Sequence, residues 1–221
     1  MNFKKKQKPN QEEEKEDRVI IILQKACLRS IKVKDKYELL NHDDHHRIIS
    51  QSKEKLSARP DILYQTLITL QDSPLNKAGK LQIYIHTETN VLIQVNPKLH
   101  VPRTFHRFKK LMVQLLKNLT IRSTNNSEIL LKVIKNPVTK YLPTGCPIIG
   151  CSHSSDSLID LHEFVPKLPK GPIIFILGAM AHGAIDTSYS ETTISFSQFP
   201  LSASVACGKI CFAFENLWEI L

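Results

Sequence analysis

The chain has 221 residues, of which 42% are hydrophobic and 7% aromatic, and its formal net charge is +9. Such a composition is ordinary for a globular protein of one large domain. No apolar run approaches the about 18 residues of a membrane span, and the charged amino terminus lacks the apolar core of a secretory signal. These patterns favour an intracellular protein without a membrane segment.

Cysteine and histidine usage gives no sign of a metal site or a disulfide framework. The five cysteines contain no Cys-x-x-Cys pair, so we expect buried thiols. Cys207 and Cys211 are four residues apart and would share one helix face. Histidines and aspartates cluster at residues 41–46, but a polar helix start capped by Asn41 or Asp43 is the favoured interpretation. We therefore expect no metal.

The positive charge is located on the predicted folded part. Residues 1–17 hold five lysines and five acidic residues, whose charges cancel. Their alternating charge blocks predict a disordered tail, and residues 18–221 are predicted to form a single domain. The whole excess lies on that domain, which points to a polyanionic partner.

The first half of the domain alternates strand and helix patterns. Residues 19–23 form an unbroken apolar run typical of a strand covered on both faces. A helix should begin at residues 59–61 (RPD) and end at residues 72–74 (DSP). Two strand-like runs, 81–86 and 91–95, flank a short turn and predict a β-hairpin.

A basic helix is predicted after this hairpin. Thr104 can cap it, and its buried stripe is expected to consist of Phe105, Phe108, Met112, Leu115 and Leu119. Residues 90–126 contain seven cations and no acid. Arg103 and Arg107 can face one way near the helix amino terminus, whose dipole and N–H groups suit phosphate. A solvated basic face is the alternative interpretation.

The last third of the chain predicts a ligand crevice. Strand-like runs at 148–149, 173–177 and 193–197 each lead into a loop of small or turn-forming residues, and a further strand is expected at 129–134. A short helix is predicted at 158–165, capped by Asp156 or Ser157, and a final helix at 201–221 with Val205, Ile210, Phe214 and Trp218 among its buried residues. The alternation favours an α/β fold with a largely parallel sheet, in which ligands bind at the carboxyl ends of strands.

Common catalytic signatures are missing, including the Walker loop, the Gly-x-Gly-x-x-Gly turn, the Gly-x-Ser-x-Gly elbow and the His-Glu-x-x-His helix. Several longer stretches are more informative: RPD at 59–61 with DSPLN at 72–76, VPRTF at 101–105, LKVIKNP at 131–137, GAMAHG at 178–183 and PLSASVA at 200–206. With these, residues 19–221 closely resemble the eukaryotic ribosome-biogenesis pseudouridine N1-methyltransferase family, of the SPOUT (α/β-knot) class.

The resemblance implies a fold and an activity. The expected fold is a largely parallel sheet flanked by helices, with a carboxyl-terminal segment threaded into a deep trefoil knot. The expected enzyme is a homodimer that uses S-adenosylmethionine, releases S-adenosylhomocysteine, and methylates N1 of a pseudouridine in a hairpin of small-subunit (18S) rRNA. A role in ribosome biogenesis beside other pre-ribosome assembly proteins, in the nucleus and nucleolus, is implied as well.

The resemblance also implies site residues. The cofactor pocket would comprise Cys151, Gly178, Gly183, Ala184, Ile185, Phe196, Ser197, Gln198, Phe199, Pro200 and Leu201. Cys151 stands where a larger aliphatic residue is expected, which should alter packing rather than chemistry. In the dimer implied by the resemblance, Phe214 and Trp218 of the final helix would face the partner chain.

The RNA-contacting positions implied by the resemblance are Arg59, His100, Arg103 and Arg107. His100 replaces a usual arginine and loses a permanent charge and a bidentate fork. Asp61 would orient or deprotonate the target base, the alternative being that it only caps its helix or pairs with Arg59. An assembly factor with secondary or lost methyl transfer, and a knotted enzyme acting on another RNA such as tRNA, are the rival interpretations.

Overall fold

The computed structural model describes residues 16–52 and 58–221, so the predicted tail lies outside the described residues apart from Glu16 and Asp17. The central strand is β1 (Val19–Ala26), which pairs in parallel with β4 (Leu81–Thr87) and β9 (Ile173–Gly178). Alternate β1 side chains enter two separate apolar clusters, one on each face of the sheet. The prediction of a strand buried on both faces is therefore confirmed.

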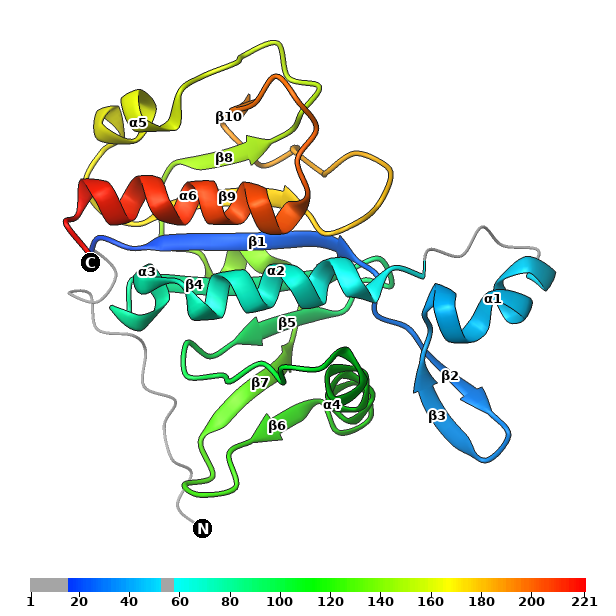
Figure 1. Ribbon diagram of the computed structural model, residues 1–221. Helices are drawn as coiled ribbons and strands as arrows, with labels where there is room; N and C mark the ends of the chain where they lie inside the picture. The colour runs from blue at the N-terminus through cyan, green and yellow to red at the C-terminus, as the bar shows by residue number, and fades with distance from the viewer. Residues whose placement is uncertain (1–15, 53–57) are drawn as a thin grey trace.

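Eight strands form one sheet in the order β10-β8-β9-β1-β4-β5-β7-β6 (Figure 1). The half from β10 (Thr192–Ile194) and β8 (Ile148–Cys151) to β4 is parallel. The other half is antiparallel and contains β5 (Leu92–Val95), β7 (Ile129–Ile134) and β6 (Thr120–Arg122). The predicted hairpin is β4–β5, and the carboxyl ends of the parallel strands share one edge of the sheet.

Helices cover one face of this sheet. There α2 (Pro60–Asp72) lies beside α6 (Ala203–Leu217), with α3 (Pro74–Lys77) and α4 (Phe105–Asn118) nearby (Figure 1). The other face is packed by Val138, Leu142 and Tyr189 from η2 (Val138–Tyr141) and loops. Helices thus flank the sheet on one side, where the larger apolar cluster lies.

Short polar side chains set several helix starts. Asn41 caps α1 (His42–Gln51) by accepting from the Asp44 amide, as predicted, and Ser202 caps α6 by accepting from Val205 N. Thr104 occupies the N-cap position of α4, but its side chain makes no capping bond. A hairpin of β2 (Ser30–Val33) and β3 (Lys36–Leu39), which the sequence pattern did not predict, projects beside α1 (Figure 1).

The structure corrects the prediction of a helix at residues 158–165. α5 (Leu161–Phe164) begins later and is capped by Asp160 rather than by Asp156 or Ser157; it is followed by η3 (Val165–Lys167). The later start has a cause in the backbone. Ile159 N donates to the Ser195 carbonyl at 2.8 Å, and Leu158 forms an isolated parallel β-bridge with Ser195. A helix cannot include residues whose backbone groups pair in this extended way.

Predictions for three apolar residues are also corrected. Leu119 is not part of the buried stripe of α4: it ends the helix with a left-handed φ of 60° and is 54% exposed. On α6, Val205 is exposed, whereas Phe214 is buried against Phe175 and so cannot face a partner chain. Trp218 is half-buried and packs on Phe214.

The segment around Ile194 and Ser195 passes between the two arms of an earlier loop. Ser152 N, just after β8, donates to the Ile194 carbonyl at 3.0 Å. On the other side, Ser195 N donates to the Ser157 carbonyl at 2.8 Å. The two ends of residues 152–157 therefore flank, on opposite sides, a segment that follows them by about forty positions in the sequence.

Within the described ranges, no helix has the length and apolar character needed to cross a membrane, and no group of three or more potential metal ligands is assembled. All five cysteines lie outside disulfides. Cys207 and Cys211 are buried on one face of α6. Burial raises the pKa of the Cys211 thiol to about 12.

Candidate functional site

A cavity of about 440 Å³ lies where β8, β9 and β10 end. Its walls come from the loop after β8, the loop after β9, residues 194–199, the first turn of α6, and the start of α2. This is the carboxyl edge of the parallel half-sheet, the place where α/β folds bind ligands, and its volume is that of a small-molecule site. The predicted crevice is therefore present as a cavity.

The predicted cofactor residues divide into two groups. Those that line the cavity are Cys151, Gly178, Phe196, Ser197, Phe199 and Leu201. Gly183, Ala184 and Ile185 follow in the same loop as Met180, which does line the cavity, and Gln198 lines an adjoining groove instead. Pro200 lies between two lining residues, Phe199 and Leu201, without lining the cavity itself.

Some lining residues were not predicted. Met180, Ala181 and His182 come from the loop after β9, and small residues of the first α6 turn contribute Ser202, Ala203, Ser204 and Ala206. The amino terminus of a 15-residue helix thus borders the cavity. Its unsatisfied N–H groups and positive dipole end favour an anionic ligand group such as a carboxylate. The run of small residues after Pro200 is the signal that could have identified this wall.

Glycines shape the loop after β9. A Cβ on Gly178 would lie 3.0 Å from Met180 Cε and 3.3 Å from Ile185 Cγ2, so the missing side chain lets the loop fold back over the strand end. Gly183 has a φ of +115°, a conformation that L side chains rarely adopt. The loop shape therefore depends on both glycines.

Gln24, at the carboxyl end of β1, holds the far side of the same loop and was also missed. Its backbone carbonyl accepts from Ala179 N at 2.7 Å. Its buried side chain bonds the backbone of Asp186 and donates to the Tyr189 hydroxyl at 2.8 Å. One residue thus fixes both ends of the loop that contains Gly183, Ala184 and Ile185.

The thiol nearest the cavity is not activated. Burial raises the pKa of the Cys151 thiol well above its ordinary value, and the same cause acts on the pKa of Cys207. Both side chains therefore stay protonated at neutral pH, and neither has the lowered pKa of a nucleophilic cysteine. Cys151 acts as a small apolar wall.

Arg59 and Asp61 form a bidentate pair at the start of α2. Arg59 Nε donates to Asp61 Oδ1 at 2.9 Å and Arg59 Nη2 donates to Asp61 Oδ2 at 2.7 Å. The Asp61 carboxylate raises the pKa of the Arg59 guanidinium. Arg59 lines the cavity whereas Asp61 does not. Of the roles considered for Asp61, the structure therefore shows the ion pair with Arg59. In this pair the Asp61 carboxylate sets the direction of the Arg59 guanidinium.

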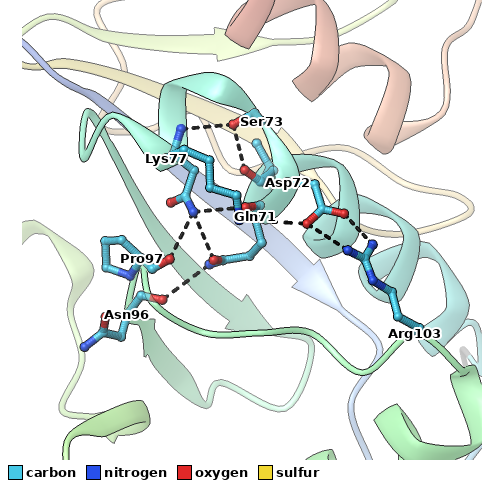
Figure 2. A network of polar contacts seen from close by, with 9 residues as sticks. Gln71, Asp72, Ser73, Lys77, Asn96, Pro97 and Arg103 are labelled. Atoms are coloured by element: carbon cyan, nitrogen blue, oxygen red, sulfur yellow. Dashed lines mark hydrogen bonds and ion pairs between the residues drawn. The ribbon is translucent and has the colours of Figure 1, made fainter.

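Arg103 is also held by a carboxylate. Its Nη1 lies 2.5 Å from Asp72 Oδ2, and Figure 2 shows the arginine reaching from the segment before α4 to the end of α2. Close to this pair in the sequence, Asn76 Nδ2 donates to the carbonyls of Gln71 and Pro97 at 3.1 and 3.0 Å. This network fixes the segment that leads to Arg103 against the α2–α3 corner.

The seven cations of residues 90–126 are less isolated than the sequence suggested. Three of them pair with acids from other elements: Lys98 with Glu128, Arg103 with Asp72, and Lys109 with Asp44. Of the other predicted RNA positions, His100 and Arg107 are exposed, and neither forms an ion pair among the described residues. The remaining uncompensated charge therefore lies mainly on α4.

A second groove of about 440 Å³ adjoins the cavity, since both share Phe196 and Ser197. Phe212 of α6 lines it, is 56% exposed, and contacts the His162 ring edge-on at 5.9 Å. Val205 lies seven residues earlier on the same side of α6 and is 51% exposed. The outer side of α6 is therefore apolar near the cavity.

Comparison with known proteins agrees with this arrangement. A family model described as EMG1/NEP1 methyltransferase matches residues 21–215. The chain is 48% identical over 205 residues to the Homo sapiens protein named ribosomal RNA small subunit methyltransferase NEP1, covering 92% of this chain and 83% of that protein. The Drosophila melanogaster protein of the same name is 45% identical over 213 residues, covering 93% and 84%.

A solved structure has the same fold. The crystal structure of Archaeoglobus fulgidus Nep1 bound to S-adenosylhomocysteine matches with a TM-score of 0.76 at 20% identity, covering 90% of this chain and 98% of that one. The α/β fold with its largely parallel sheet, expected from the sequence, is confirmed.

Proposed function

This chain belongs to the EMG1/NEP1 methyltransferase family, and on that premise we propose that it transfers a methyl group from S-adenosylmethionine to small-subunit rRNA. The observation that carries the proposal is the cavity at the carboxyl ends of β8, β9 and β10, bordered by the α6 amino terminus. Its relatives are named as small-subunit rRNA methyltransferases. The protein is accordingly a ribosome biogenesis factor.

The residues around the cavity fit the cofactor. Phe196 and Leu201 supply apolar walls. The loops that follow Cys151 and Gly178 would offer main-chain N–H and C=O groups to an adenine edge. The first turn of α6 suits the carboxylate of the methionine part. Gly183, Ala184, Ile185, Gln198 and Pro200 would support this pocket from the adjoining loops. When bound, the cofactor supplies an electrophilic methyl group.

The target atom is proposed to be N1 of a pseudouridine. Transfer forms the N1–methyl bond, breaks the sulfur–methyl bond, and releases the N1 proton and S-adenosylhomocysteine. In-line positioning supplies much of the rate of such a reaction. Digestion of the product RNA to nucleosides tests the assignment: the methyl must lie on N1 of pseudouridine, and a methyl on ribose or on another base would contradict it.

Arg59 is proposed to connect the RNA with the cavity. It lines the cavity, and its guanidinium is directed by Asp61 through two parallel bonds. Arg103, Arg107 and His100 would bind the phosphates of the hairpin, and the target base would be flipped into the cavity. This supports an orienting role for Asp61, since its carboxylate oxygens are already engaged.

Three further assignments belong to the same proposal. The carboxyl-terminal part is proposed to form a trefoil knot, supported by the passage of Ile194 and Ser195 between the arms of residues 152–157. A homodimer is supported by the exposed apolar side of α6 at Val205 and Phe212. Residues 18–221 are proposed to form a single domain that acts together with other pre-ribosome assembly proteins. Its proposed location is the nucleus and nucleolus, where such proteins assemble ribosomal subunits.

Titration calorimetry with S-adenosylhomocysteine separates this proposal from an RNA-binding assembly factor without transfer. We expect one site per chain in the wild type. A matched variant, Ala206→Leu, adds bulk where the first turns of α6 line the cavity and should weaken binding. Absence of heat in the wild-type chain, with the fold intact by circular dichroism, would favour the assembly factor.

A further inference from the structure

The uncompensated positive charge of α4 forms a stripe. Arg107, Lys110 and Lys117 recur at spacings of three and seven residues, which places them on one side of the helix. The stripe extends about 15 Å from Arg107 to Lys117 at the α-helical rise per residue. Lys110 and Lys117 form no ion pair within residues 16–52 and 58–221. The charge is therefore available to a ligand.

The stripe ends in a groove that the proposed catalytic site does not use. This groove has a volume of about 740 Å³ and lies between α4 and the β3 strand of the projecting hairpin. Lys36 and Tyr37 line it from the hairpin, and Lys110 and Lys117 line it from α4. Figure 1 shows this hairpin beside α4, away from α6.

Tyr37 is an aromatic ring on the edge of this groove. It lies on the same face of β3 as Leu39, two residues later, and Leu39 is buried in the core. The face of β3 that carries Tyr37 is therefore the face turned toward the protein core, yet the Tyr37 side chain is 59% exposed. A ring in this position is available for stacking because no core packing covers it.

Two acids line the groove, and both have partners. Asp44 forms an ion pair with Lys109, and Glu38 lies 3.2 Å from the imidazole of the buried His45. Lys36, Lys110 and Lys117 lie outside these contacts, so the groove stays net positive even with Glu38 counted as a full negative charge. A cationic channel with an exposed aromatic ring is the combination that binds single-stranded nucleic acid, in which phosphates meet cations and bases stack on rings.

We propose that the groove between α4 and β3 binds an unpaired stretch of rRNA that flanks the target hairpin. Lys36, Lys110 and Lys117 contact its phosphates, and Tyr37 stacks on one of its bases. Arg107 connects the two regions, since it belongs both to the predicted hairpin contacts and to the stripe. This inference rests on the proposed rRNA substrate and adds a second recognition element to it.

The test measures RNA binding by the full chain. The target hairpin is prepared with a blunt stem, with an added unpaired flank on either strand in turn, and with a double-stranded extension of the same length. We expect the flank to raise affinity for the wild type. In Lys110→Ala/Lys117→Ala the ratio of the two Kd values should fall toward one, and the slope of log affinity against log salt for the flanked RNA should become shallower by about 1.4.

A matched control removes the same charge elsewhere. Lys167→Ala/Lys170→Ala deletes two exposed lysines between α5 and β9 and should preserve the gain from the flank. Tyr37→Ala should reduce that gain by about fivefold or more, the effect of losing one stacked base. Tyr37→Phe should restore it, because stacking needs the ring and not the hydroxyl.

The proposal is overturned if neither flank raises affinity, if the α4 double variant behaves like its control, or if only a double-stranded extension gives the gain. These outcomes are distinguishable from failure of the proposed function. If the wild type methylates the blunt hairpin but ignores the flank, only the groove assignment is wrong. If it methylates neither RNA and binds no S-adenosylhomocysteine, the proposed function itself fails.

Discussion

The side-chain amide of Gln24 pairs with the backbone of Asp186 in both directions. Its Nε2 donates to the Asp186 carbonyl at 3.0 Å, and its Oε1 accepts from Asp186 N at 2.7 Å. The two residues are 162 positions apart, so the end of β1 closes the loop that follows β9. The cavity wall thus depends on a side chain that does not line the cavity itself.

Replacing Gln24 should loosen this wall. Gln24→Ala removes the side-chain partner of the Asp186 backbone groups and should lower the free energy of unfolding by about 1–3 kcal/mol. It should also weaken S-adenosylhomocysteine binding, measured by titration calorimetry. Tyr189→Phe is the matched control, because it removes only the hydroxyl that Gln24 contacts and should cost about 0.5–1.5 kcal/mol. Equal cofactor affinity in wild type and Gln24→Ala would show that the loop does not need this clamp.

The backbone of Gly183 gives a second prediction for the same loop. Its φ of +115° is strained for any residue with a Cβ, so Gly183→Ala should weaken S-adenosylhomocysteine binding on the order of tenfold. Gly79→Ala makes the same change at another positive φ, in the turn before β4, where a Cβ meets no atom within 4 Å. That control should lose some stability but keep its cofactor affinity. Equal losses of affinity in both variants would refute a local effect.

The Arg59–Asp61 pair predicts the behaviour of Asp61→Asn. Because an amide holds a guanidinium less firmly than a carboxylate, KM for RNA should rise on the order of tenfold, while the shape of the pH profile of kcat stays the same. Arg59→Lys keeps the charge but loses the bidentate geometry, and should resemble Asp61→Asn. A collapse of kcat with loss of one limb of the pH profile would instead identify Asp61 as the general base.

Much of the fold was readable from the sequence because local patterns coincided with tertiary burial. The apolar run that became β1, the hairpin β4–β5, and strand β7 all lie where predicted. The β2–β3 hairpin was missed because its strands are short and few of their side chains are buried. Lysines at every second position (Lys32, Lys34 and Lys36) gave the segment the appearance of a polar loop. The late start of α5 was missed because its cause is a long-range pairing with Ser195.

The candidate site was less readable for the same reason. Strand exits such as Cys151 and Gly178 could be predicted, since each follows an apolar run. The clamp at Gln24 could not, because a glutamine inside a strand pattern carries no signal until its distant partner is known. The ion pair of Arg103 with Asp72 could not be predicted either. Residues 90–126 contain no acid, so the partner of Arg103 is known only once the tertiary structure is known.

Stability at low pH should depend on Asp44. Its hydrogen bonds with Lys109 and Asn41 lower its pKa in the folded state, so it stabilises the fold above the unfolded pKa of about 4. The contribution is lost as pH falls through the lowered folded value. Asp44→Asn should therefore cost at most about 1 kcal/mol at neutral pH, since the pair is partly exposed, and progressively less as the pH falls through the lowered folded pKa. A cost that is independent of pH in urea unfolding would contradict this assignment.

The central claim is that the cavity at the sheet edge supports methyl transfer to N1 of a pseudouridine. The most direct measurement is the transfer of labelled methyl from S-adenosylmethionine to two small-subunit rRNA hairpins that differ only in carrying pseudouridine or uridine at the target position. Uridine has no N1–H, because that nitrogen carries its ribose. We expect transfer of up to one methyl per RNA to the pseudouridine hairpin and none to the uridine hairpin. Equal transfer to both, or transfer to neither by a chain that binds S-adenosylhomocysteine, would contradict the claim.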